Sequence, residues 1–227
     1  MGILDQLLFL ISVLGTFNGL LLAGYLFFSP SVAHQYKFLA ALILVISIRV
    51  SKSIWFYFDP QLGQQLLQLG VSACFLIGPL LYFYIAAFTG QLTSLRFKWT
   101  WHLGLLIGLI VGLGGLFPYQ SHTQLWGGFY QLINYSWAIY IALTGVLLFP
   151  KAFDWVGNNT QLSQDELLAF TVYVSTAIIW LAYFTASYTS YIVGALSLSM
   201  TLYVSILLWR NEKNHTHIKN QYDVDKR

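Results

Sequence analysis

The sequence carries very little charge. Of its 227 residues, 11 are Lys or Arg and 8 are Asp or Glu, so charged residues make up 8% of the chain, whereas 57% are hydrophobic. Soluble domains contain about 25% charged residues, which excludes an ordinary soluble domain. The net charge of +3 comes from cations too few and too dispersed to form a nucleic-acid surface. The composition instead predicts a membrane protein.

Cysteine and catalytic motifs are also scarce. Cys74 is the only cysteine, so no internal disulfide can form, and its apolar surroundings predict a buried, inert thiol. No motif of a zinc protease, a serine hydrolase or a phosphate-binding loop occurs. All acidic residues fall at the ends of the apolar runs or beyond them, which argues against a proton-driven pump. We therefore expect no enzyme activity, no metal site and no cofactor.

Long apolar runs account for most of the chain. Each is long enough to cross about 30 Å of hydrocarbon as a helix. The connectors contain residues that interrupt helices, and Pro150 is expected to end the fifth run. Only a three-residue connector separates the last two runs, which predicts a tight antiparallel hairpin. The seven expected spans are Leu7–Phe28, Lys37–Phe58, Leu66–Phe88, Trp99–Phe117, Leu125–Phe149, Leu167–Phe184 and Tyr188–Trp209.

The Lys and Arg residues outside these spans follow a strict alternation. They occur in the first, third and fifth connectors and in the tail, and they are absent from the N-terminal end and the other connectors. Because cations favour the cytoplasmic side, the N-terminus is expected outside and the C-terminus in the cytoplasm. The sequence thus predicts an all-α polytopic membrane protein. Its domains would be a seven-helix transmembrane bundle (1–209) and a short polar cytoplasmic tail (210–227).

Two cations, Arg49 and Lys52, lie inside the second span. A charge near the bilayer centre costs roughly 2.5–3.5 kcal/mol on insertion scales, so such a residue predicts a functional site. Their three-residue spacing places both on one helical face, and Ser53 extends this polar patch. One interpretation is a pocket for an anionic ligand, such as a lipid headgroup or an acidic amphiphile. The other is structural: Lys52 extends towards the outer headgroups, where Asp5 or Asp59 meets it, and Arg49 contacts a tyrosine or backbone carbonyls freed by Pro79.

Glycine and proline mark two further features. Pro79, after Gly78, lies inside the third span and predicts a kink, because proline removes a helical hydrogen bond. Gly104, Gly108 and Gly112 recur at four-residue spacing in the fourth span, a pattern that lets another helix approach closely. This stripe predicts either helix packing within the bundle or a homodimer face.

Three segments resemble a known family. The run FLIGPLLYFY (75–84) resembles a signature of the seven-helix N-terminal membrane region of bacterial membrane-bound AraC-type transcription regulators. The pattern IRVSKS (48–53) is similar to that family's Leu-Arg-x-x-Lys-Ser stretch, and YIVGALS (191–197) is a weaker match. The resemblance implies a sensory role for the membrane part. The family's DNA-binding helix-turn-helix motifs have no counterpart in 210–227, so no direct nucleic-acid binding by this chain is expected.

Together these features predict a multi-pass, receptor-like module of the bacterial inner membrane. It would bind a lipid or an anionic amphiphile near Arg49, Lys52 and Ser53. The ligand would favour one packing around Pro79 and so signal to the cytoplasmic side. The alternative is an accessory or structural subunit of a larger membrane complex, docked as a homodimer or on a partner membrane protein through the glycine stripe. A small-solute transporter ranks third, because no convincing internal repeat is present.

Overall fold

The computed structural model describes residues 3–29, 33–58, 63–92, 98–158, 162–185 and 196–208, and these residues form helices and short connections without any strand. A short helix, Leu196–Leu208, follows six long ones. The long helices are α1 (Ile3–Phe28), α2 (His34–Phe58), α3 (Gly63–Phe88), α4 (Trp99–Leu116), α5 (Thr123–Asn158) and α6 (Gln164–Thr185).

All six long helices are long and apolar enough to cross a membrane. Their outer surface is also apolar: Leu105, Val111, Val146 and Leu181 are among many large hydrophobic side chains that are more than half exposed. A backbone that satisfies its hydrogen bonds within each helix, covered by an apolar surface, is what a bilayer requires. The expected helical membrane-type bundle is therefore present in the described residues.

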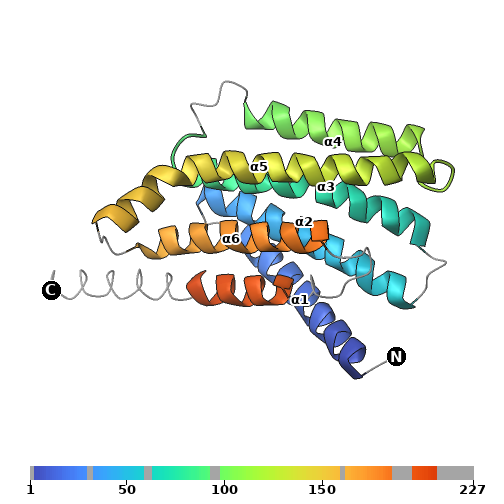
Figure 1. Cartoon of the computed structure of the whole chain (residues 1–227), viewed down its shortest axis with the longest axis horizontal. Coiled ribbons are helices and arrows are strands. Elements are labelled where there is room, and N and C mark those ends of the chain that lie inside the picture. The colour runs from blue at the N-terminus through green and yellow to red at the C-terminus, as the bar shows by residue number, and fades with distance from the viewer. Residues whose placement is uncertain are drawn as a thin grey trace.

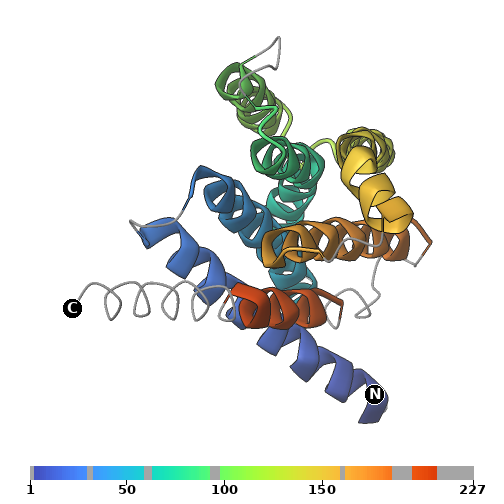
Figure 2. The ribbon, with the colours of Figure 1, turned by 90° about the vertical axis from the view of Figure 1, so that its left-hand side faces the viewer.

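The long helices run alternately in opposite directions (Figure 1). α3 is central, because it packs on α2, α4, α5 and α6, while α1 packs on α2. Figure 2 shows α4 at one edge of the bundle, beyond α3, and α1 and the Leu196–Leu208 helix at the opposite edge. The core lies mainly between α2 and α3. Its most buried members include Leu39, Leu42, Ile43, Ile77, Leu81 and Ile85.

Three cations gather at one end of the bundle, the end where α2, α4 and α6 begin. Lys37 donates to the Leu26, Phe27 and Ser29 carbonyl oxygens at 3.1, 2.6 and 3.0 Å, and so caps the end of α1. Lys98 precedes α4, whose Trp99 ring contacts Phe38 of α2 at 5.1 Å between centroids. Lys37, Lys98 and Lys151 therefore share one end of the described bundle, which agrees with the alternation of cations in the sequence.

Lys151, the third of these cations, lies within a helix. The expectation that Pro150 ends the fifth span is wrong, because α5 continues to Asn158. Proline leaves only a local gap in the hydrogen-bond ladder, and contacts beyond it hold the extension. Lys151 forms an ion pair with Glu166 of α6 at 2.8 Å, and its Nζ lies 5.6 Å from the Phe88 ring centroid. Figure 1 shows this end of α5 turning toward the start of α6.

The start of α6 is also fixed by its own sequence. Ser163 and Glu166 form a capping box: the Glu166 N–H donates to the Ser163 hydroxyl at 3.2 Å, and the Ser163 N–H donates to the Glu166 carboxylate at 3.0 Å. Tyr36 of α2 donates to the neighbouring Asp165 at 2.8 Å. These contacts join α2, α5 and α6 at the cationic end.

Two predictions concern residues outside those described. The tight hairpin between the sixth and seventh spans falls on 186–195, and only Leu196–Leu208 of the seventh span is described. The tail over 210–227 likewise lies outside the described residues.

Candidate ligand-binding site

Arg49 and Lys52 are both buried in the bundle, on the part of α2 farthest from the cationic end. Arg49 is 1% exposed and Lys52 is 5% exposed. The surrounding turns supply apolar side chains, and Val50 and Ile54 are buried beside the two cations. Because α2 is apolar on nearly every face, it packs in the interior, and its two charged groups enter the interior with it.

Tyr183 of α6 forms one wall of the site. The Arg49 guanidinium carbon lies 4.7 Å from the centroid of the Tyr183 ring, a cation–π arrangement. Two residues of α5 hold Tyr183 in place. The Tyr130 hydroxyl donates to the Tyr183 carbonyl at 3.3 Å, and the Trp137 and Tyr183 ring centroids are 6.1 Å apart. A tyrosine is one of the two partners that the structural interpretation allows for Arg49.

Gly70 of α3 forms a second wall, against Lys52. A Cβ at Gly70 would lie 2.5 Å from Cδ and 2.9 Å from Cγ of Lys52, closer than real carbon atoms approach. The aliphatic stem of Lys52 therefore lies directly on the α3 backbone. This burial argues against the interpretation in which Lys52 extends to the outer headgroups, since the side chain is enclosed between two helices.

Two cationic side chains lie next to each other at this site. Arg49 and Lys52 are close enough to repel each other, and the buried thiol of Cys74 lies within electrostatic range of Lys52. Two of the carboxylates whose side chains are described, Asp165 and Glu166, bind Tyr36 and Lys151 at the other end of the bundle. The Ser53 side chain, part of the predicted patch, lies outside the described residues. The arrangement can hold an anionic group between two adjacent cations.

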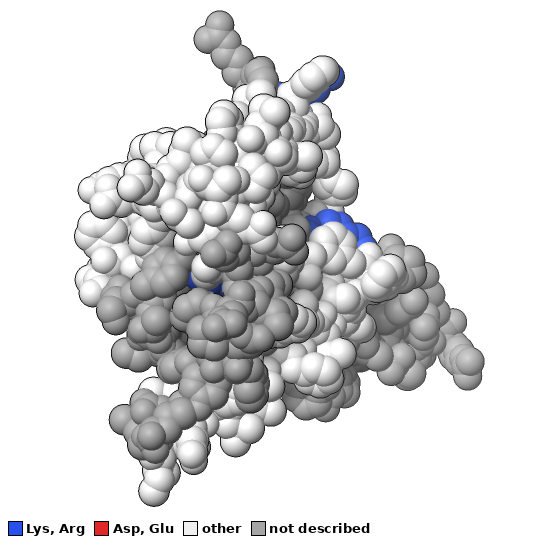
Figure 3. Space-filling view, turned by 90° about the vertical axis from the view of Figure 1, so that its right-hand side faces the viewer, with Lys and Arg blue, Asp and Glu red and all other residues white. Residues whose placement is uncertain are grey.

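Little of this charge is displayed on the surface. Figure 3 views the end of the bundle where α2 and α6 finish, and only small areas of Lys and Arg are visible there. No Asp or Glu is seen on the described part of this face. The cation pair therefore forms an enclosed site and not an open basic patch.

Gly78 and Pro79 are buried in α3, which continues past both residues. A Cβ at Gly78 would lie 3.0 Å from the Tyr140 side chain of α5, so Gly78 allows that ring to approach the α3 backbone. The Tyr140 hydroxyl in turn hydrogen-bonds His102 of α4 at 2.6 Å. Gly78 thus lies where α3 meets α5, and α5 in turn contacts α4. The kink expected at Pro79 stays a prediction.

Gly104, Gly108 and Gly112 lie on the outside of the bundle. A Cβ at any of the three would meet no atom of the described chain within 4 Å. The stripe lies along a shallow groove whose other lining residues are Trp101, Leu105, Leu109, Leu113 and Leu116, all from α4. Because no described residue packs on it, a face for another chain is the interpretation that stays open.

Sequence reasoning missed Gly70 and Tyr183. Gly70 carries a signal, because a glycine inside a helix is destabilising by about 0.5–1 kcal/mol relative to alanine and so implies a close contact. Tyr183 carries none, since the chain contains 15 tyrosines and nothing distinguishes this one before the helices are assembled.

The comparisons with known proteins give no family. No protein-family model, no curated protein and no solved structure matches this chain. The resemblance to the membrane region of AraC-type regulators accordingly stays a prediction.

Proposed function

We propose that this chain is a sensor module of the bacterial inner membrane that binds a small anionic or amphiphilic ligand at Arg49 and Lys52. The observation that carries the proposal is the burial of both cations on one turn of α2, where Arg49 contacts the Tyr183 ring and Lys52 contacts the Gly70 backbone. An intramembrane cation pair is expensive to keep. A ligand anion would lower that cost by forming charge-assisted hydrogen bonds.

The proposed signal runs through α3. Lys52 touches α3 at Gly70, and farther along the same helix Gly78 receives Tyr140, which binds His102 of α4. A ligand that repositions Lys52 would therefore favour one arrangement of α3 over another, with Pro79 as the weak point of the helix. The N-terminus would lie outside and the cationic end of the bundle in the cytoplasm, where the shift would be read.

Retention of phosphatidylglycerol, an anionic amphiphile, tests this site. The purified chain is titrated with phosphatidylglycerol or with phosphatidylcholine of the same acyl chains, and bound lipid is counted by native mass spectrometry. We expect Arg49→Gln and Lys52→Ala each to weaken phosphatidylglycerol binding by about 10-fold or more, because charge-assisted bonds contribute roughly 1.5–3 kcal/mol. Lys98→Ala, which removes an exposed cation at the other end, is the control and should leave binding unchanged.

Unchanged retention in both Arg49→Gln and Lys52→Ala would overturn the proposal. Arg49→Lys, which keeps the charge, separates loss of binding from loss of folding. It should retain more lipid than Arg49→Gln at an equal melting temperature.

The outward glycine stripe of α4 favours a second candidate, an accessory subunit of a larger membrane complex. Small residues let helix backbones approach closely in a bilayer, where packing contacts drive association. Gly108→Ile would fill the groove, and we expect it to reduce self-association or co-purification of a stoichiometric partner by at least about 5-fold. Ile107→Val, whose exposed side chain points about 100° away from that of Gly108 on the same helix, is the control. If the chain stays monomeric at every lipid-to-protein ratio and co-purifies with no partner protein, this candidate is ruled out.

A further inference from the structure

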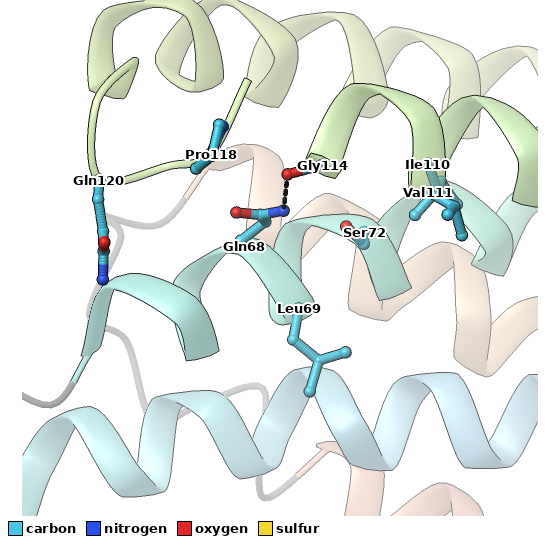
Figure 4. A pocket seen from close by; sticks show the side chains of 8 residues that line it. All are labelled: Gln68, Leu69, Ser72, Ile110, Val111, Gly114, Pro118 and Gln120. Carbon is cyan, nitrogen blue, oxygen red and sulfur yellow. Dashed lines mark hydrogen bonds between the residues drawn. The ribbon is translucent and has the colours of Figure 1, made fainter. Parts of the chain in front are cut away.

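A second cavity lies between α3 and α4, away from the cation pair. Its volume is about 460 Å³, within the range of small-molecule sites. Figure 4 shows its eight lining residues, with Gln68 in the gap between the two helices. The lining residues described are Gln68, Leu69, Ser72, Ile110, Val111, Gly114, Pro118 and Gln120.

Gln68 is held in a fixed orientation in this cavity. Its Nε2 donates to the Gly114 carbonyl at 3.0 Å, and its Oε1 accepts from the Tyr119 N–H at 3.0 Å (Figure 4). A Cβ at Gly114 would lie 2.5 Å from that Nε2, so a larger residue there would displace the Gln68 amide from this position. Because a primary amide has two N–H groups and two lone pairs on its oxygen, one donor and one acceptor position are left for a ligand.

Ser72 adds a hydroxyl on the same face of α3, one turn after Gln68. The hydroxyls of Thr144 and Thr176 donate to the carbonyl four residues earlier in their own helices. Ser72 is only half-buried and makes no such bond within the described chain. Its hydroxyl is therefore available to a ligand in the cavity.

The remainder of the lining is apolar and uncharged. Leu69 and Val111 are 53% and 68% exposed, and no Lys, Arg, Asp or Glu is among the described lining residues. An ionised headgroup would lose its hydration here without gaining an opposite charge. Gln68 and Ser72 also face away from Gly70, because two residues along a helix turn the side chain by about 200°. α3 thus separates the cavity from the cation pair.

We propose that this cavity binds an uncharged amphiphile, with one hydrocarbon chain and a headgroup that both donates and accepts hydrogen bonds. The headgroup, an alcohol, ester or amide, bonds to Gln68 and Ser72. The hydrocarbon chain lies along Leu69, Ile110 and Val111, which are open to the surroundings of the bundle. This site does not depend on any ligand at Arg49 and Lys52.

The test uses a monoacylglycerol carrying a photoreactive diazirine on its acyl chain, with the full chain in phosphatidylcholine nanodiscs. We expect cross-links to peptides containing 68–72 and 110–118. Val111→Trp, which fills the cavity, should reduce labelling at least fivefold. Leu105→Trp, at a similarly exposed position outside the cavity, should not. Ser72→Ala should reduce labelling about 3- to 10-fold, which is the change in affinity expected from the loss of one hydrogen bond.

Competition separates specific binding from bulk lipid contact. Excess unlabelled monoacylglycerol should displace the probe, and excess phosphatidylglycerol should not. Labelling that is spread along all exposed helices, or that is equal in Val111→Trp and Leu105→Trp, would overturn the site. Equal displacement by phosphatidylglycerol would overturn its preference for an uncharged headgroup.

Discussion

At the scale of single residues, the glycines of this protein have opposite structural roles. Gly70 lies where the stem of Lys52 crosses α3, and Gly78 lies where Tyr140 approaches the same helix. Gly104 and Gly108 in α4 have open space around them. In each case the local sequence is an apolar helix that contains an isolated or repeated glycine. Only the neighbouring helix therefore distinguishes a glycine that a close contact requires from one beside open space.

The change Gly70→Ala tests the contact with Lys52. The new methyl group would overlap Cδ and Cγ of Lys52, so we expect a loss of roughly 1–3 kcal/mol in the free energy of unfolding. Unfolding by denaturant in detergent measures it. Gly104→Ala is the matched control and should change stability by less than about 0.5 kcal/mol or increase it, because alanine favours a helix.

A double-mutant cycle identifies the cause of the loss. Combined with Lys52→Ala, the Gly70→Ala change should lose much of its effect, since the overlapping atoms are gone. Additive losses in the double variant, or equal effects of Gly70→Ala and Gly104→Ala, would contradict this packing.

At the scale of elements, the junction between α5 and α6 shows how local signals compete. Pro150 is a strong helix-breaking signal, yet α5 passes through it and brings Lys151 to Glu166. The spacing of Ser163 and Glu166 is an equally local signal, a capping box, and it does mark the start of α6. The ion pair is partly exposed, with side chains 38% and 24% accessible, so the cap is the stronger of the two contributions.

Ser163→Ala and Glu166→Gln separate these contributions. Loss of the Ser163 hydroxyl should destabilise the start of α6 by about 0.5–2 kcal/mol. Glu166→Gln keeps a capping acceptor and removes only the charge, so its effect should stay below about 1 kcal/mol. Hydrogen exchange of the first amides of α6 is the measurement, with Ser175→Ala in the middle of the same helix as control. A larger effect for Glu166→Gln than for Ser163→Ala would show that the ion pair dominates.

At the scale of the whole molecule, the two ends of the bundle differ in character. One end carries Lys37, Lys98 and Lys151 together with the contacts that join α2, α5 and α6. The two buried cations lie toward the other end. The proposed ligand site and the contacts that join α2, α5 and α6 therefore lie toward opposite ends of the bundle.

The sidedness of the bundle can be measured with single cysteines. In a Cys74→Ala background, we expect Lys98→Cys to react with a membrane-impermeant maleimide only after permeabilisation, because cations favour the cytoplasmic side. Ser121→Cys, in the connector between α4 and α5, should react in intact cells. Cys74→Ala alone is the control for background labelling. The reverse pattern would invert the topology and place the cation pair in the cytoplasmic half.

The sequence by itself determined the helical class, the positions of six long apolar helices, and the two cations that stand out among them. Those properties depend on composition and on runs along the chain, which need no knowledge of neighbours. The Ser163–Glu166 spacing is also a local signal, although the sixth span is predicted to begin only at Leu167. The tertiary structure decided that Lys52 is enclosed against Gly70, that Tyr183 lies on Arg49, that the glycine stripe of α4 faces outward, and that Gln68 and Ser72 line a cavity. Each of these depends on which face of one helix packs against another helix. Because the faces of these helices are similarly apolar, the sequence does not indicate the pairing, and the packing of the whole bundle decides it.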